Sequence, residues 1–98
     1  MEILDPDQQT FADVFDAICD MPAEAANMKA RSDLLSILVD RVKSWGVTQE
    51  TAAARLGVTR PRLNDLMRGK ISKFSLDALV NLATAAGLVL ELRASEAA

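Results

Sequence analysis

The residues best suited to chemistry lie between positions 55 and 73, where six Arg and Lys residues and a single acidic residue, Asp65, give a local net charge of +5. An arginine guanidinium can bind the O6 and N7 atoms of guanine, and an asparagine amide can bind the N6 and N7 atoms of adenine. Lysine and arginine also bind phosphates, which orients a protein on DNA without reading its sequence. This stretch therefore predicts a DNA-contacting surface in a chain whose overall charge is −3.

Each residue of the predicted surface receives a role from its chemistry and position. We expect base reading from Arg60, Arg62 and Asn64, at the start of a helix whose N-terminal end enters the major groove. Asp65 has two interpretations: it reads a cytosine amino group, or it only holds Arg62 or Arg68 at i±3 spacing. The residues expected to contact phosphates are Gln49, Thr59, Arg68, Lys70 and Lys73.

Two short helices joined by a tight turn would position these residues. The first is predicted from Thr48 as N-cap to a stop at Gly57, and the second from about residue 60 to a stop at Gly69. Ala53 is small enough for the second helix to pass close by, and Val58 would fill the angle between the helices. These features favour a helix-turn-helix over a plain helical hairpin.

The remaining apolar patterns predict an all-α domain of five or six helices. A short amphipathic stripe lies near the N-terminus, a long helix ends at Gly46, and Ser75 caps a last helix that ends at Gly87. The residues expected in the core of the long helix and the helix-turn-helix are Leu34, Leu35, Leu38, Val42, Trp45, Ala52, Leu56, Leu63 and Leu66.

Beyond Gly87 the periodicity changes from helical to alternating. Leu88, Leu90 and Leu92 alternate with three other residues, a pattern typical of a half-buried strand. No other segment offers a ladder partner, so we expect this strand to pair with its twin in a second protomer, antiparallel about Leu92. The alternative is an extended coil that lies on the chain's own core.

Residues 30–86 resemble the phage-repressor-like (XRE) family of helix-turn-helix domains, with Gln49 at the start of the first helix of the motif. The runs 57–62 and 66–70, followed by residues 74–77, resemble the small antitoxin-like members and, among them, the HigA antitoxins. The resemblance implies a lambda-repressor-like fold, a dimer bound to operator DNA, autorepression of the operon and neutralisation of a RelE/HigB-like toxin. The chain departs from this family in closing with an expected strand where phage repressors have another helix.

The first 28 residues carry seven acidic side chains and no Lys or Arg, a net charge of −7. Together with an apolar stripe at helical spacing, this charge predicts a docking surface for a basic toxin. The alternative is that the stripe packs on the chain's own long helix or on the partner protomer while the carboxylates are solvated. The stripe consists of Phe11, Val14, Phe15 and Ile18.

The predicted organisation has three parts: an acidic N-terminal helical extension at residues 1–28, the helix-turn-helix domain at 29–87, and a dimerisation strand and tail at 88–98. The alternative to a DNA-binding function is a protein–protein adaptor that keeps the helix-turn-helix scaffold without specific DNA binding. Salt separates the two, because DNA binding weakens steeply as salt rises.

The composition argues against several other classes of protein. With no histidine and one cysteine, the chain cannot build Cys/His zinc sites or histidine-dependent catalytic triads. We therefore expect no enzyme, no metal site and no cofactor. No apolar run approaches the ~18 residues of a membrane span, and the start lacks the basic residues of a signal peptide, so we expect a cytoplasmic protein without membrane contact.

Overall fold

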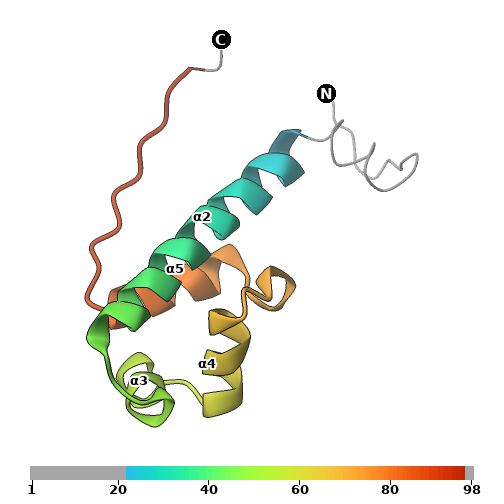
Figure 1. Cartoon of the computed structure of the whole chain (residues 1–98). Coiled ribbons are helices and arrows are strands. Elements are labelled where there is room, and N and C mark those ends of the chain that lie inside the picture. Colours follow the sequence, from blue (N-terminus) through green and yellow to red (C-terminus); the bar gives the residue numbers. More distant parts are fainter. Residues whose placement is uncertain (1–21, 97–98) are drawn as a thin grey trace. The chain divides into compact units, whose positions relative to one another are not determined.

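The computed structural model describes residues 22–96, which contain four α-helices and one short 3-10 helix (Figure 1). The chain divides into two compact units, residues 1–30 and 31–98. The functional residues of the described part belong to the second unit. In chain order the elements are α2 (Pro22–Trp45), α3 (Gln49–Leu56), α4 (Arg60–Met67), η1 (Ile71–Lys73) and α5 (Leu76–Ala85).

Three helices begin at a side chain that accepts a hydrogen bond from the backbone three residues on. Thr48 Oγ1 accepts from the amide of Thr51 at 3.2 Å, and Thr59 Oγ1 accepts from the amide of Arg62 at 3.2 Å. Ser75 Oγ accepts from the amide of residue 78 at 3.1 Å. Such caps satisfy amide groups that a helix leaves unpaired at its start, each contributing about 1 kcal/mol. The predicted caps at Thr48 and Ser75 are confirmed.

The turn between α3 and α4 is made by Gly57 and Val58. Gly57 has a left-handed backbone with φ of 72°, which residues with a side chain adopt only at a cost. The amide of Val58 then donates to Ala53 O at 3.0 Å, and the Val58 side chain packs, half-buried, against the core. The turn therefore has the form that the sequence predicted.

One apolar cluster joins all five elements. Its most completely buried large side chains come from α2, α4, the segment after η1, and α5, and α3 adds two small alanines. Leu34, Leu35, Leu38 and Val42 are the buried residues of α2, as expected, whereas Trp45 at its end is half-buried. The largest fully buried side chains are Phe74, Leu38, Leu63, Leu66 and Leu79.

Two arginines of α2 join the ends of other elements by hydrogen bonds to backbone carbonyls. Arg41 Nε donates to Ala86 O at 3.0 Å, just after α5 ends. Arg31 Nη1 donates to Phe74 O at 3.3 Å, just before α5 begins. Carbonyls at the C-terminal end of a helix lack a partner within that helix, so Arg41 satisfies such an acceptor at the end of α5. Together the two arginines hold α2 to the residues that flank α5 on both sides.

The expected C-terminal strand is not supported, because residues 88–96 form no strand and leave α5 as an extended coil (Figure 1). A strand requires ladder hydrogen bonds to a second backbone, and the described residues of one chain supply none. The alternative was an extended coil that lies on the chain's own core. Of the segment's apolar residues, only Leu88 packs against the core. Val89 is 87% exposed and Leu92 is 95% exposed, so no part of the described chain covers them.

The expected total of five or six helices is likewise not supported, since the described residues hold four α-helices. The helix predicted on the apolar stripe near the N-terminus lies outside the described residues, and so does the alternative packing proposed for it. The stripe residues in question are Phe11, Val14, Phe15 and Ile18.

Replacing Leu38 should test the core. Leu38 is completely buried on α2, so Leu38→Ala removes apolar contacts and leaves a cavity, with an expected loss of about 2–5 kcal/mol in the free energy of unfolding. Its neighbour Ile37 is 52% exposed, and Ile37→Ala should change that free energy by only about 0.5 kcal/mol. Urea unfolding, followed by the fluorescence of the single tryptophan, measures both, and equal losses would contradict the assignment of Leu38 to the core.

Candidate nucleic-acid interface

Helix α4 turns one face to the core and presents the other to solvent. Leu63 and Leu66 are each 1% exposed, and they fix how the helix is rotated about its axis. At 3.6 residues per turn, the opposite side is formed by residues near positions 61, 65 and 68. Pro61 and Arg68 are exposed there, and Asp65 is half-buried. The recognition surface is therefore fixed by two buried leucines.

The N-terminal end of α4 is also open to solvent. Thr59 caps it, Arg60 is its first residue, and proline at the next position needs no amide hydrogen bond in the first turn. Arg60 is exposed, whereas Asn64, one turn later, is half-buried. Of the residues expected to read bases, Arg60 is thus the most accessible.

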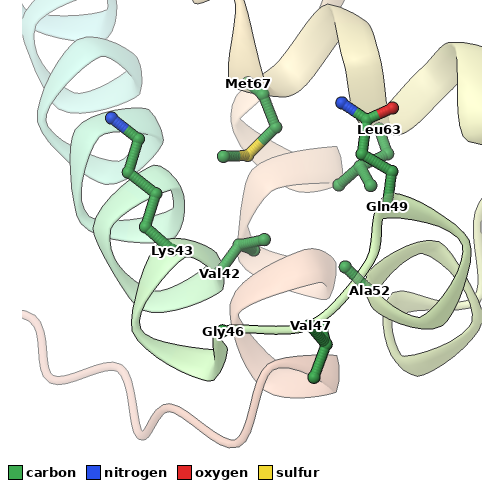
Figure 2. A pocket seen from close by; sticks show the side chains of 8 residues that line it. All are labelled: Val42, Lys43, Gly46, Val47, Gln49, Ala52, Leu63 and Met67. Atoms are coloured by element: carbon green, nitrogen blue, oxygen red, sulfur yellow. The ribbon is translucent and has the colours of Figure 1, made fainter.

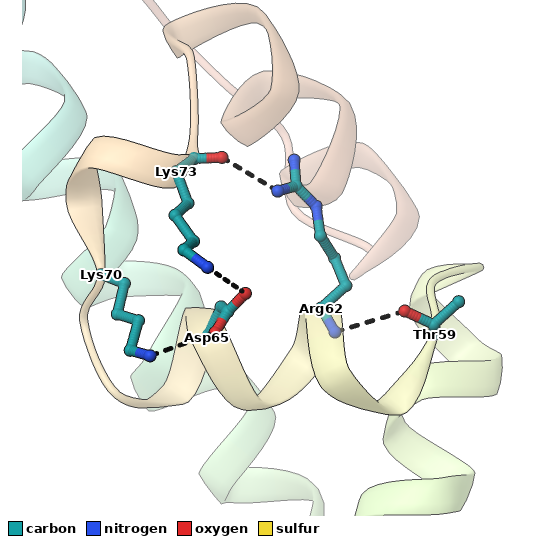
Figure 3. A network of polar contacts seen from close by, with 5 residues as sticks. All are labelled: Thr59, Arg62, Asp65, Lys70 and Lys73. Carbon is teal, nitrogen blue, oxygen red and sulfur yellow. Dashed lines mark hydrogen bonds and ion pairs between the residues drawn. The ribbon is translucent and has the colours of Figure 1, made fainter.

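Arg62 lies in a different environment, folded back onto its own chain (Figure 3). Its Nη1 donates a hydrogen bond to Lys73 O at 2.9 Å. The guanidinium carbon lies 4.1 Å from the centre of the Phe74 ring, within the range of a cation–π interaction. Arg62 therefore joins α4 to the segment that leads into α5, a role that its sequence position did not indicate.

Asp65 lies between two lysines (Figure 3). Its Oδ1 is 3.6 Å from Lys70 Nζ, and its Oδ2 is 3.6 Å from Lys73 Nζ. The arginines expected at i±3 are not the partners that the structure gives it. The chain reverses at Gly69, which has a φ of 73°, and the segment that contains Lys70 and η1 brings both lysines back beside Asp65.

The residues expected to contact phosphates are all exposed, but they differ in what surrounds them. The Thr59 hydroxyl oxygen already accepts the capping hydrogen bond. Arg68 follows the last residue of α4. The side chains of Lys70 and Lys73 are 43% and 54% exposed and remain paired with Asp65.

Gln49 lies at the edge of a hollow of about 180 Å³ between the end of α2, the start of α3 and α4 (Figure 2). Lys43, in the last turn of α2, lines the same hollow. Sequence reasoning gave Lys43 no role, because its proximity to Gln49 depends on how α2 and α3 meet. The lining residues are Val42, Lys43, Gly46, Val47, Gln49, Ala52, Leu63 and Met67.

Arg55 belongs to the basic stretch but not to the surface of α4. Its guanidinium carbon lies 4.9 Å from the centre of the Trp45 ring. Arg55 itself is exposed, and its guanidinium covers one face of the half-buried tryptophan. This contact joins the end of α3 to the end of α2.

No curated protein matches the chain. The described residues contain no group of three or more His, Cys, Asp or Glu side chains arranged to hold a metal ion. No helix in that part of the chain is long and apolar enough to cross a membrane.

A family model described as a helix-turn-helix domain matches residues 17–95, most of the chain. The match confirms the helix-turn-helix predicted from the turn at Gly57 and from the small side chain of Ala53, both of which the structure places as expected. The chain belongs to the helix-turn-helix domain family, and membership of this family indicates a DNA-binding regulator.

Proposed function

We propose that this protein is a sequence-specific repressor of the antitoxin type. In this proposal it belongs to the XRE branch of helix-turn-helix proteins, resembles HigA antitoxins, and binds the operator of its own operon as a homodimer. It also neutralises a RelE/HigB-like toxin. It acts in the cytoplasm by binding alone, without enzymatic activity, a metal or another cofactor.

The open N-terminal end of α4 is the observation that carries this proposal. Arg60 stands exposed beside the helix cap, and no hydrogen bond or ion pair within residues 22–96 engages its guanidinium. In helix-turn-helix proteins that end of the second helix reaches base edges in the major groove. At the other end of α4, Arg68 and the two lysines of the following turn add positive charge of the kind that phosphate binding requires.

Base reading is assigned first to Arg60 and second to Asn64. Arg60 can grip guanine, and Asn64 is half-buried one turn along, where it can reach adenine. Arg62 can read a base only if its guanidinium leaves Lys73 O and the Phe74 ring. It is therefore a weaker candidate for base reading than Arg60 or Asn64.

Dimerisation is supported by the apolar residues after α5. Leu92 and Val89 are almost fully exposed, and Leu90 is 49% exposed. Exposed apolar side chains in a row mark an interaction site. An antiparallel pair of two copies centred on Leu92 would gather Leu90 and Leu92 of both copies on one face, with Val89 on the other. It would also set Glu91 opposite Arg93 of the partner protomer, an attractive pairing.

Binding to the DNA upstream of its own gene tests the repressor assignment. The purified protein should bind that duplex more tightly than a scrambled duplex, with two chains per site. Its affinity should fall steeply between about 50 and 200 mM salt, because each neutralised phosphate contributes about −0.9 to the logarithmic salt slope. Equal, weak binding to both duplexes would reject a repressor that acts alone and would favour the adaptor function.

Arg60→Ala should reduce discrimination between sequences. We expect it to cost about 1–3 kcal/mol on the upstream duplex and little on the scrambled duplex, because a bidentate contact with guanine is lost. Arg68→Ala is the matched control, an exposed arginine at the other end of α4. It should weaken both duplexes alike and reduce the salt slope by about 0.9. Competition binding measures both variants, and equal losses of Arg60→Ala on the two duplexes would remove Arg60 as a base reader.

Deleting residues 1–20 tests the toxin-docking role of the acidic segment. If the apolar stripe and its carboxylates bind the toxin, the truncated protein should keep its thermal unfolding midpoint and its DNA affinity while losing affinity for the product of the neighbouring gene. Calorimetric titration against that product is the measurement. Full-strength binding by a folded, truncated protein would show that the toxin docks elsewhere.

A further inference from the structure

We propose that Asp65 determines DNA specificity by restraining Lys70 and Lys73. In the free protein the Asp65 carboxylate holds both ammonium groups against α4. The lysines leave it and bind phosphates only where the edge of a matching base takes their place as the partner of the carboxylate. This inference rests on the proposed sequence-specific DNA binding, because it concerns how the same surface distinguishes its operator from other DNA.

The two lysines are held at both their side chains and their backbones. Each carboxylate oxygen of Asp65 pairs with one ammonium group at 3.6 Å. The amide of Lys70 donates to Asp65 O at 3.1 Å, and Lys73 O accepts from Arg62 Nη1 at 2.9 Å. The turn after α4 is thus fixed to α4 at residues 62 and 65, and this keeps both lysines within reach of one carboxylate (Figure 3).

Charge explains why this arrangement weakens binding to random DNA. Two ammonium groups and one carboxylate present a net charge of +1, where the same two lysines beside a neutral side chain at position 65 would present +2. A lysine that stays on Asp65 neutralises no phosphate and releases no counterion, so it adds nothing to sequence-independent affinity. The side chain of Asp65 is also only 20% exposed, less than that of either lysine.

Discrimination arises when the lysines are released. Ion pairs between exposed groups are weak, so phosphates can draw the lysines away from Asp65. The carboxylate then needs another donor, since an unpaired acceptor at a protein–DNA contact is costly. A base with an amino group at its major-groove edge, as cytosine has, supplies that donor, and other bases leave the carboxylate unsatisfied beside the DNA. Release is therefore favourable only on a matching sequence.

Arg62 acts as a positioning residue in this network. Its guanidinium packs on the ring of the fully buried Phe74 and donates to Lys73 O, so it holds the backbone from which the Lys73 side chain reaches Asp65. The restraint of Lys73 depends on this anchor.

Asp65→Asn in the full chain tests the proposal, with Asp40→Asn as a matched control. Asp40 is an exposed acidic residue on α2, so both variants remove one negative charge. Affinity is measured on the upstream duplex and on its scrambled counterpart at about 50 and 200 mM salt. Asp65→Asn should bind the scrambled duplex about fivefold or more tightly than the wild type, with a salt slope steeper by about 0.9 for each released lysine. Its preference for the upstream duplex should fall, whereas Asp40→Asn should preserve that preference.

Adding Lys70→Gln and Lys73→Gln to Asp65→Asn should abolish the gain on the scrambled duplex, because the gain comes from those two lysines. Unchanged thermal unfolding midpoints, read from Trp45 fluorescence, show that the variants remain folded. The proposal is overturned if Asp65→Asn behaves like Asp40→Asn, or if it loses affinity only for the upstream duplex, which would make Asp65 a direct base reader alone. If the wild type does not prefer the upstream duplex, the repressor function is rejected instead. The comparison of Asp65→Asn with the wild type on the scrambled duplex would still show whether Asp65 restrains the two lysines.

Discussion

The close packing of α3 against α4 is the constraint on which the rest of this structure depends. Ala52 and Ala53 are almost fully buried, and their small side chains let the backbone of α4 approach α3. Leu63 and Leu66 complete the contact from α4 and set its rotation about its own axis. Which side chains reach solvent, and hence DNA, is therefore decided by how the core is filled.

Positive charge serves two physical purposes in this protein. Arg31, Arg41 and Arg62 each donate to a backbone carbonyl at the end of an element or one residue beyond it, and these hydrogen bonds join separate elements of the fold. Arg60 and Arg68 point outward from the two ends of α4. A count of basic residues cannot separate these purposes, because the same guanidinium serves either a carbonyl or a nucleic acid, depending on what lies within its reach.

Much of the local structure could be predicted because its signals lie within a few residues of one another. The caps at Thr48 and Ser75 act on amides three residues away, and the left-handed turn at Gly57 needs only its own missing side chain. The prediction of a C-terminal strand was not supported, because a strand depends on a partner that local sequence signals do not reveal. Alternation shows that a segment suits an extended, half-buried position, but a strand exists only where a second backbone completes the ladder.

The sequence by itself determined the four described helices, the buried faces of α2, α3 and α4, and the positive charge around α4, because these follow from local caps, apolar periodicity and composition. Only the tertiary structure decided what the charged residues do. Asp65 has several basic residues within one or two turns, and its partners became Lys70 and Lys73 because the chain reverses at Gly69 and returns them to α4. The strength of an ion pair or hydrogen bond depends on the distance between the groups in space. The separation of Asp65 from each basic residue along the chain therefore does not show which of them becomes its partner.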